Sequence, residues 1–108
     1  MSSFDLTDRV AIVTGGSKGL GKATALALAG AGANVAIIAR EPEPVTDGRS
    51  RPHEPVEPVV DEINAMGRRA IGVTADVRDQ AQVESMVEQA MTEFGRIDIL
   101  VNVVGGSW

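Results

Sequence analysis

A glycine-rich run near the amino terminus carries the clearest chemical signal in this chain. It extends from Thr14 to Gly21 with the sequence TGGSKGLG, follows the apolar stretch 10–13 and leads into an alanine-rich segment. The order strand, glycine turn and helix places unpaired backbone N–H groups at a helix N-terminus, where the helix dipole also favours an anion. Glycine leaves room for a tight turn and for a ligand close to the backbone. The run therefore predicts a phosphate-binding turn of the kind that holds the pyrophosphate of a dinucleotide.

Alternating strand-like and helix-like segments surround this turn and predict an α/β domain with a parallel sheet. The elements that we expect are strands at 10–14, 35–39, 70–75 and 97–104, and helices at 20–31, 58–66 and 80–94. Right-handed crossovers give the spatial strand order 3-2-1-4. The pattern is that of a Rossmann-like doubly wound sheet, of which these four strands and three helices are the first half.

The third predicted helix shows the clearest end signals. Asp79 is a candidate N-cap, Gln82 completes a capping-box pattern with it, and Gly95 ends the helix. One apolar stripe at helical spacing is expected to lie in the core, and it consists of Val83, Met86, Val87, Ala90, Met91 and Phe94.

Two segments depart from a regular α/β pattern. The range 41–58 holds all five prolines and is expected to be a long solvated loop inserted into a single domain spanning 1–108. The fourth strand has the composition of an interior strand, yet no later segment covers it, so the domain looks truncated. An exposed apolar edge of this kind invites pairing with another chain.

Composition narrows the possible partners. The 108 residues carry a formal net charge of −5 without a basic patch, which argues against nucleic acid. The chain has no cysteine, and its one histidine, His53, lies among prolines, so no metal site is expected. No signal peptide and no apolar run of about 20 residues is evident, so we expect a cytoplasmic protein with no membrane partner.

Three motifs in order resemble the short-chain dehydrogenase/reductase family. They are the glycine run 14–21, the pair Asp76-Val77 after the third strand, and the segment 98–102 that matches the start of the family's fourth-strand motif. The resemblance covers roughly residues 6 to 107. It implies a nicotinamide cofactor and hydride transfer between that cofactor and a carbonyl or alcohol.

The resemblance also implies roles for individual positions. Gly15, Gly19 and Gly21 shape the phosphate turn, and the N–H of Leu20 faces the pyrophosphate. Asp76 accepts a hydrogen bond from the adenine amino group. The remaining implied cofactor contacts are Ser17 and Lys18 at the adenosine ribose and its phosphate, Val77 beside the adenine ring, and Asn102 and Gly105 toward the nicotinamide ribose.

Arg40 bears on the choice of cofactor. It ends the second predicted strand, where an acidic residue would accept hydrogen bonds from a free ribose 2′-hydroxyl. An arginine pairs instead with a 2′-phosphate, and Lys18 supplies a second cation. We therefore predict NADP rather than NAD. The alternative for Arg40 is a solvated charge at a strand end. Asp76 is alternatively a turn carboxylate, and Asn102 alternatively satisfies only backbone groups.

Two departures from the family pattern affect the function. Val103 and Val104 stand where the family has its second asparagine and its alanine, and both changes alter the expected cofactor path. The family's catalytic serine, tyrosine and lysine all lie beyond the fourth strand, and this chain contains no tyrosine. No catalytic residue is therefore assigned, and the sequence does not identify the substrate.

Three functions remain open from the sequence. The first is the N-terminal cofactor-binding part of an NADP-dependent oxidoreductase that is not catalytic by itself. The second is a non-catalytic dinucleotide-binding module. The third is an assembly piece that pairs, as a homo-oligomer or with a longer relative, through the edge of its fourth strand.

Overall fold

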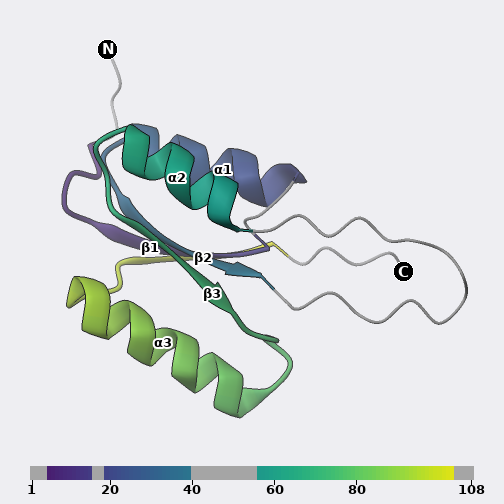
Figure 1. The fold of residues 1–108 in the computed structure, drawn as a ribbon. Helices are drawn as coiled ribbons and strands as arrows, with labels where there is room; N and C mark the ends of the chain where they lie inside the picture. Colours follow the sequence, from purple (N-terminus) through teal and green to yellow (C-terminus); the bar gives the residue numbers. More distant parts are fainter. Residues whose placement is uncertain (1–4, 16–18, 40–55, 104–108) are drawn as a thin grey trace, which may run out of the picture.

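The fold is a four-stranded parallel sheet between helices, seen in a computed structural model that describes residues 5–15, 19–39 and 56–103. The elements are β1 (Val10–Thr14), α1 (Gly19–Gly30), β2 (Asn34–Ala39), α2 (Glu57–Ala65), β3 (Ala70–Thr74), α3 (Gln80–Phe94) and β4 (Ile99–Asn102). The strand order is β3-β2-β1-β4, which confirms the predicted order. Helices α1 and α2 cover one face of the sheet, and α3 covers the other (Figure 1).

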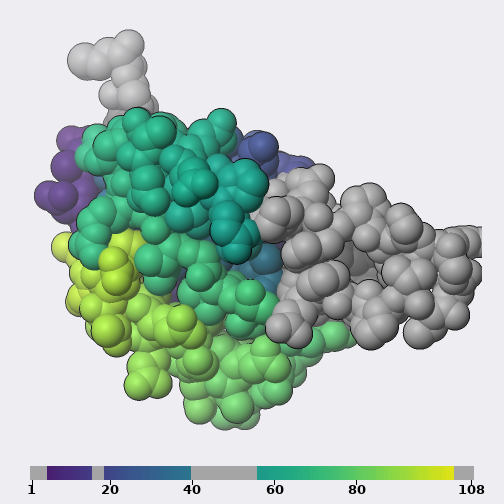
Figure 2. All heavy atoms as spheres, in the orientation of Figure 1, coloured from purple at the N-terminus to yellow at the C-terminus, as the bar shows by residue number. Residues whose placement is uncertain are grey.

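Two apolar clusters hold these layers together. The cluster under α1 and α2 consists of Val13, Ala25, Ala29, Val35, Ile37, Val59 and Ile63. The cluster under α3 consists of Ile12, Ala36, Ile38, Val73, Ala75, Met86 and Ala90. All of β1 is buried because both of its faces are covered, which explains its continuous apolar sequence. Side chains of α2 and α3 occupy the upper and lower parts of the face in Figure 2.

The start of α3 confirms the predicted cap but not the predicted capping box. Asp79 Oδ1 accepts a hydrogen bond from the Ala81 N–H at 2.9 Å. The Gln82 side chain does not return to the Asp79 N–H, because that group already donates to the Asp76 carbonyl at 3.0 Å. Gln82 Oε1 accepts instead from the Asp76 N–H at 2.8 Å. Gln82 Nε2 also donates to Asp79 Oδ2 at 3.1 Å, so the glutamine links the turn after β3 to the N-cap side chain.

The predicted apolar stripe of α3 is wider than the face that the helix buries. Met86 and Ala90 are buried, whereas Val87 is 38% and Met91 44% exposed. Placing Val87 and Met91 in the core was wrong. Each lies about 100° around the helix from a buried residue, Met86 or Ala90, beyond the arc that faces the sheet.

The strand β4 is shorter than predicted and lies at an edge of the sheet. It ends at Asn102, although the Val103 N–H still donates to the Thr14 carbonyl at 3.3 Å. Leu100 is 63% exposed, whereas an interior strand would bury it. The position of Val104 is outside the described residues.

The predicted proline-rich loop overlaps α2 by two residues. The helix begins at Glu57, so Pro58 lies in its first turn, where a missing N–H costs no helical hydrogen bond. The remainder of the predicted loop, up to residue 55, falls outside the described part of the chain.

Candidate functional site

The carboxyl ends of the four strands lie along one edge of the sheet. Thr14 of β1 is in register with Asn102 of β4, and Ala39 of β2 with Thr74 of β3. In parallel α/β sheets, ligands bind outside the carboxyl ends of the strands. The segments that the sequence singled out follow β1, β3 and β4 and are therefore brought to the same edge (Figure 1).

The predicted glycine turn after β1 is described at its two ends, Gly15 and Gly19. Gly15 has φ +71° and Gly19 has φ +57°, a region that residues with a Cβ rarely adopt. A Cβ on Gly15 would lie 2.7 Å from the Val103 carbonyl oxygen, so the turn packs directly against the end of β4. Ser17 and Lys18 lie outside the described residues, so their predicted contacts are not placed.

The start of α1 fits a phosphate group. The helix begins at Gly19. Apart from the adjacent residues and the helix's own backbone, no atom of the described residues lies within 4 Å of the position that a Cβ on Gly19 would take. The first turn has no acidic residue, so nothing there opposes an anion at the positive end of the helix dipole. Leu20 is 73% exposed, and Gly21 is buried against the sheet. The geometry thus leaves open space where N–H groups lack intrahelical partners.

Asp76 and Val77 lie in the turn between β3 and α3. Val77 is 42% exposed, which leaves its apolar surface available to a flat ring. The Asp76 carboxylate accepts hydrogen bonds from Arg78, through both the backbone N–H and the guanidinium. Sequence reasoning missed this partner, although an arginine two residues after an aspartate in a tight turn is a readable signal.

Asn102 joins the ends of two strands. Its Oδ1 accepts a hydrogen bond from the Thr14 hydroxyl at 2.6 Å. Thr14 is 4% exposed, whereas Asn102 is an exposed residue, so this bond is partly buried. The partner of Asn102 is thus a side-chain hydroxyl, whereas the alternative for this residue expected backbone groups. Its predicted contact with the nicotinamide ribose stays a prediction. Arg40 and Gly105 lie outside the described residues.

A second charged cluster lies at the opposite, amino edge of the sheet. Asp98 accepts two hydrogen bonds from Arg96, at 2.6 and 2.8 Å, and one from the Val10 N–H at 2.9 Å. The Arg96 hydrogen bonds, followed by that of Val10, lower the pKa of Asp98 to about 2. This carboxylate ties β4 to β1 and is remote from the glycine turn.

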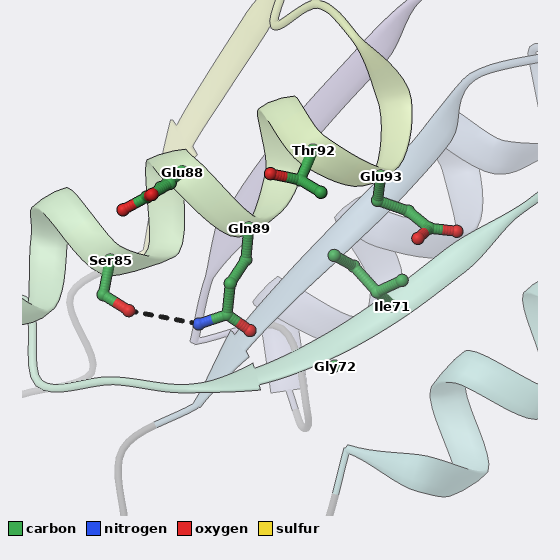
Figure 3. A pocket seen from close by; sticks show the side chains of 7 residues that line it. All are labelled: Ile71, Gly72, Ser85, Glu88, Gln89, Thr92 and Glu93. Carbon is green, nitrogen blue, oxygen red and sulfur yellow. Dashed lines mark hydrogen bonds between the residues drawn. The ribbon is translucent and has the colours of Figure 1, made fainter.

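A shallow groove of about 480 Å³ lies between α3 and the free edge of β3 (Figure 3). Ile71 and Gly72 form one side, and Ser85, Glu88, Gln89, Thr92 and Glu93 line it from α3. Within it Gln89 Nε2 donates to Ser85 Oγ at 3.2 Å. The groove contains none of the predicted site residues.

Comparison with known proteins decides the family. The profile of the short chain dehydrogenase family matches residues 9–108, which is nearly the whole sequence. The chain belongs to the short-chain dehydrogenase family. The fold and the expected glycine turn agree with this membership.

Individual relatives show how much of a short-chain dehydrogenase is present. An uncharacterized oxidoreductase of Mycobacterium tuberculosis is 41% identical over 107 residues, which are 99% of this chain and 36% of that protein. A short chain dehydrogenase from Mycobacterium thermoresistibile superimposes with a TM-score of 0.81 at 33% identity, over 96% of this chain and 36% of its own. The chain thus spans about a third of these relatives.

One solved neighbour carries a cofactor. A blue fluorescent protein from a metagenomic library, in complex with NADPH, is 38% identical with a TM-score of 0.78, over 96% of this chain and 39% of its own. Family membership supports a nicotinamide dinucleotide as the cofactor. Among the described helices, none has the length and apolarity needed to cross a bilayer.

Proposed function

We propose that this chain forms the cofactor-binding part of an NADP-dependent short-chain oxidoreductase, with the pyrophosphate at the start of α1. The open space beside Gly19 at an acid-free helix N-terminus is the observation that carries this proposal. Gly15, Gly19 and Gly21 shape the turn, and the Leu20 N–H faces the pyrophosphate. The predicted contacts of Ser17 and Lys18 complete the phosphate end.

The adenine and nicotinamide ends of the proposed site follow β3 and β4. Asp76 binds the adenine amino group, Val77 flanks the ring, and Asn102 and Gly105 line the path to the nicotinamide ribose. Arg40 and Lys18 pair with a ribose 2′-phosphate, which favours NADP over NAD. The NADPH-bound neighbour supports this choice.

The bound cofactor would supply a hydride for exchange with a carbonyl or alcohol. This chain contributes binding and orientation of the dinucleotide, and it contains no tyrosine to exchange the accompanying proton. We therefore propose that the purified chain binds the cofactor without reducing carbonyl compounds.

Titration of the purified chain with NADPH and NADH tests the proposal. We expect tighter binding of NADPH, by about 10-fold or more, because hydrogen bonds between charged groups contribute about 1.5–3 kcal/mol. Arg40→Ala should remove most of this preference. Binding of NADH that is equal to or tighter than that of NADPH contradicts the choice of NADP.

A matched pair of glycine variants tests the location of the site. Gly19 and Gly67 both have positive φ and open space where a Cβ would lie, but Gly67 follows α2 at the other edge of the sheet. Gly19→Ala and Gly67→Ala should lose similar stability from backbone strain. Only Gly19→Ala should weaken NADPH binding, because only there does the methyl group enter the proposed phosphate space.

The exposed edge of β4 supports a second candidate function, pairing with a second copy of the chain. Leu100 is in register with the buried Ile12 and therefore faces the α3 side of the sheet, yet it is 63% exposed. An uncharged edge strand with unpaired backbone groups is a template for another strand. Sedimentation should then show a dimer that Leu100→Lys dissociates, whereas a monomer at all concentrations contradicts this candidate.

A further inference from the structure

The side chain of Arg78 covers the carboxylate to which the proposed function assigns the adenine amino group. Arg78 Nη2 donates to Asp76 Oδ2 at 2.8 Å, and Arg78 Nε donates to Oδ1 at 2.9 Å. Nε also lies 3.3 Å from Oδ2, so the guanidinium spans both oxygens. We propose that Arg78 is a latch on the adenine end of the site, which must swing away before adenine reaches Asp76. This inference rests on the proposed function.

The contacts that orient Asp76 are separate from the contacts that form the latch. The Arg78 backbone N–H donates to Asp76 Oδ1 at 2.9 Å, and Gln82 Oε1 accepts from the Asp76 N–H at 2.8 Å. Neither hydrogen bond involves the guanidinium. When the Arg78 side chain moves or is removed, the turn and its carboxylate stay in place.

Opening the latch is a small rearrangement. The Arg78 side chain is 66% exposed and the Asp76 side chain 26% exposed, so water takes over the donors of the guanidinium. Exposed ion pairs of this kind are weak and are screened by salt. The latch should therefore weaken cofactor binding by a factor of about 2 to 5 and not block it.

The latch also lowers discrimination between bases. Adenine presents an amino donor, which suits a bare carboxylate, whereas hypoxanthine presents a carbonyl oxygen, which a carboxylate repels. With the guanidinium in place, its donors can satisfy that carbonyl oxygen. Arg78 thus makes the adenine end tolerant of both bases, and Asp76 without the Arg78 guanidinium is more selective.

Binding constants for two probes test this inference. The probes are NADPH and its hypoxanthine analogue, which has oxygen in place of the amino group, and the variant is Arg78→Ala. We expect NADPH binding to tighten by about 2- to 5-fold, with a higher ratio of adenine to hypoxanthine affinity. Both the NADPH affinity and the affinity ratio of Arg78→Lys should lie between those of the wild type and Arg78→Ala, since lysine pairs with one carboxylate oxygen only.

Arg96 is a matched control at the other edge of the sheet. It forms a two-oxygen pair with Asp98 at the same spacing of two residues. Arg96→Ala should lower the midpoint of thermal unfolding without changing the ratio of the affinities for NADPH and its hypoxanthine analogue. In arginine-labelled protein, NADPH should shift the Nε–H resonance of Arg78 and leave that of Arg96 unchanged.

The outcomes separate the latch from the proposed function. In one outcome the wild-type chain binds NADPH while Arg78→Ala weakens binding or leaves the ratio of adenine to hypoxanthine affinity unchanged. That result overturns the latch proposal and leaves the proposed function standing. If the wild-type chain binds neither probe, both proposals are overturned.

Discussion

The Thr14 hydroxyl donates a hydrogen bond to Asn102 Oδ1 over 2.6 Å and so joins the carboxyl ends of β1 and β4. These are the strands that lead into the glycine turn and toward the predicted nicotinamide path. The Val103 carbonyl lies against Gly15 one step beyond this bond. One partly buried hydrogen bond between side chains thus joins the two segments of the proposed site.

Removing this contact should destabilise the fold measurably. Thr14→Val keeps the shape of the side chain but removes this donor from Asn102 Oδ1, and we expect a loss of about 0.5–1.5 kcal/mol in the free energy of unfolding because water can replace the donor at the exposed Asn102. Urea denaturation followed by circular dichroism measures this loss. Thr24→Val is the control, because the Thr24 hydroxyl donates only to the Leu20 carbonyl on an exposed helix surface. Equal losses of unfolding free energy in both variants would show that the hydrogen bond of Thr14 stabilises the fold no more than that of Thr24.

Much of the fold was predictable because the spacing of apolar residues and the positions of glycines indicate the same boundaries of helices and strands. Gly95, which was predicted to end the third helix, has positive φ, and Asp79 is the cap that was predicted. Continuous apolar strands indicated a sheet covered on both faces. Crossover handedness then fixed the strand order.

The errors arise where three-dimensional packing decides. Helical spacing placed Met91 in the core, but only the actual crossing of α3 over the sheet shows which arc of the helix is buried. The predicted capping box is absent because the Asp79 N–H donates its hydrogen bond to the Asp76 carbonyl. Periodicity does not show the pairing of Arg78 with Asp76, whose signal in the sequence is the spacing of two residues in a turn.

The low pKa of Asp98 predicts a defined acid sensitivity. Hydrogen bonds from Arg96, and next from the Val10 N–H, favour the charged carboxylate and lower its pKa from 3.8 to about 2. A pKa lowered by folding adds stability that is complete above about pH 4 and is lost as the pH falls toward 2. Thermal midpoints between pH 6 and 2 should show this loss.

The variant Asp98→Asn isolates this carboxylate. It should melt at a lower temperature than the wild type at pH 6, and the difference should shrink toward pH 2. Glu62→Gln, at an exposed position of α2, should follow the wild-type curve. A constant difference between Asp98→Asn and the wild type at every pH would contradict the assignment.

Gly72 of β3 should not tolerate a side chain. A Cβ there would overlap Cγ2 of Val56 and lie 3.2 Å from its Cβ, next to the start of α2. Overpacking of this kind costs about 1–3 kcal/mol, so Gly72→Ala should lower the free energy of unfolding by that amount. Val56→Ala removes the obstructing methyl groups, so the double variant should be more stable than the sum of the two single losses predicts. Strict additivity in chemical denaturation would rule out the contact.

Gly15 should be the least replaceable glycine of the proposed site. Gly15→Ala combines strain at φ +71° with a methyl group 2.7 Å from the Val103 carbonyl oxygen, a backbone atom that moves only with the end of β4. Gly67→Ala has similar strain, at φ +86°, but within the described part of the chain no atom beyond its own neighbours lies within 4 Å of the new methyl group. The first variant should therefore lose about 1–3 kcal/mol more than the second in urea denaturation. It should also weaken NADPH binding, because displacement of the β4 end shifts Asn102 and the turn together. If Gly15→Ala instead matches Gly67→Ala in both stability and NADPH affinity, the turn and β4 are not coupled through this contact.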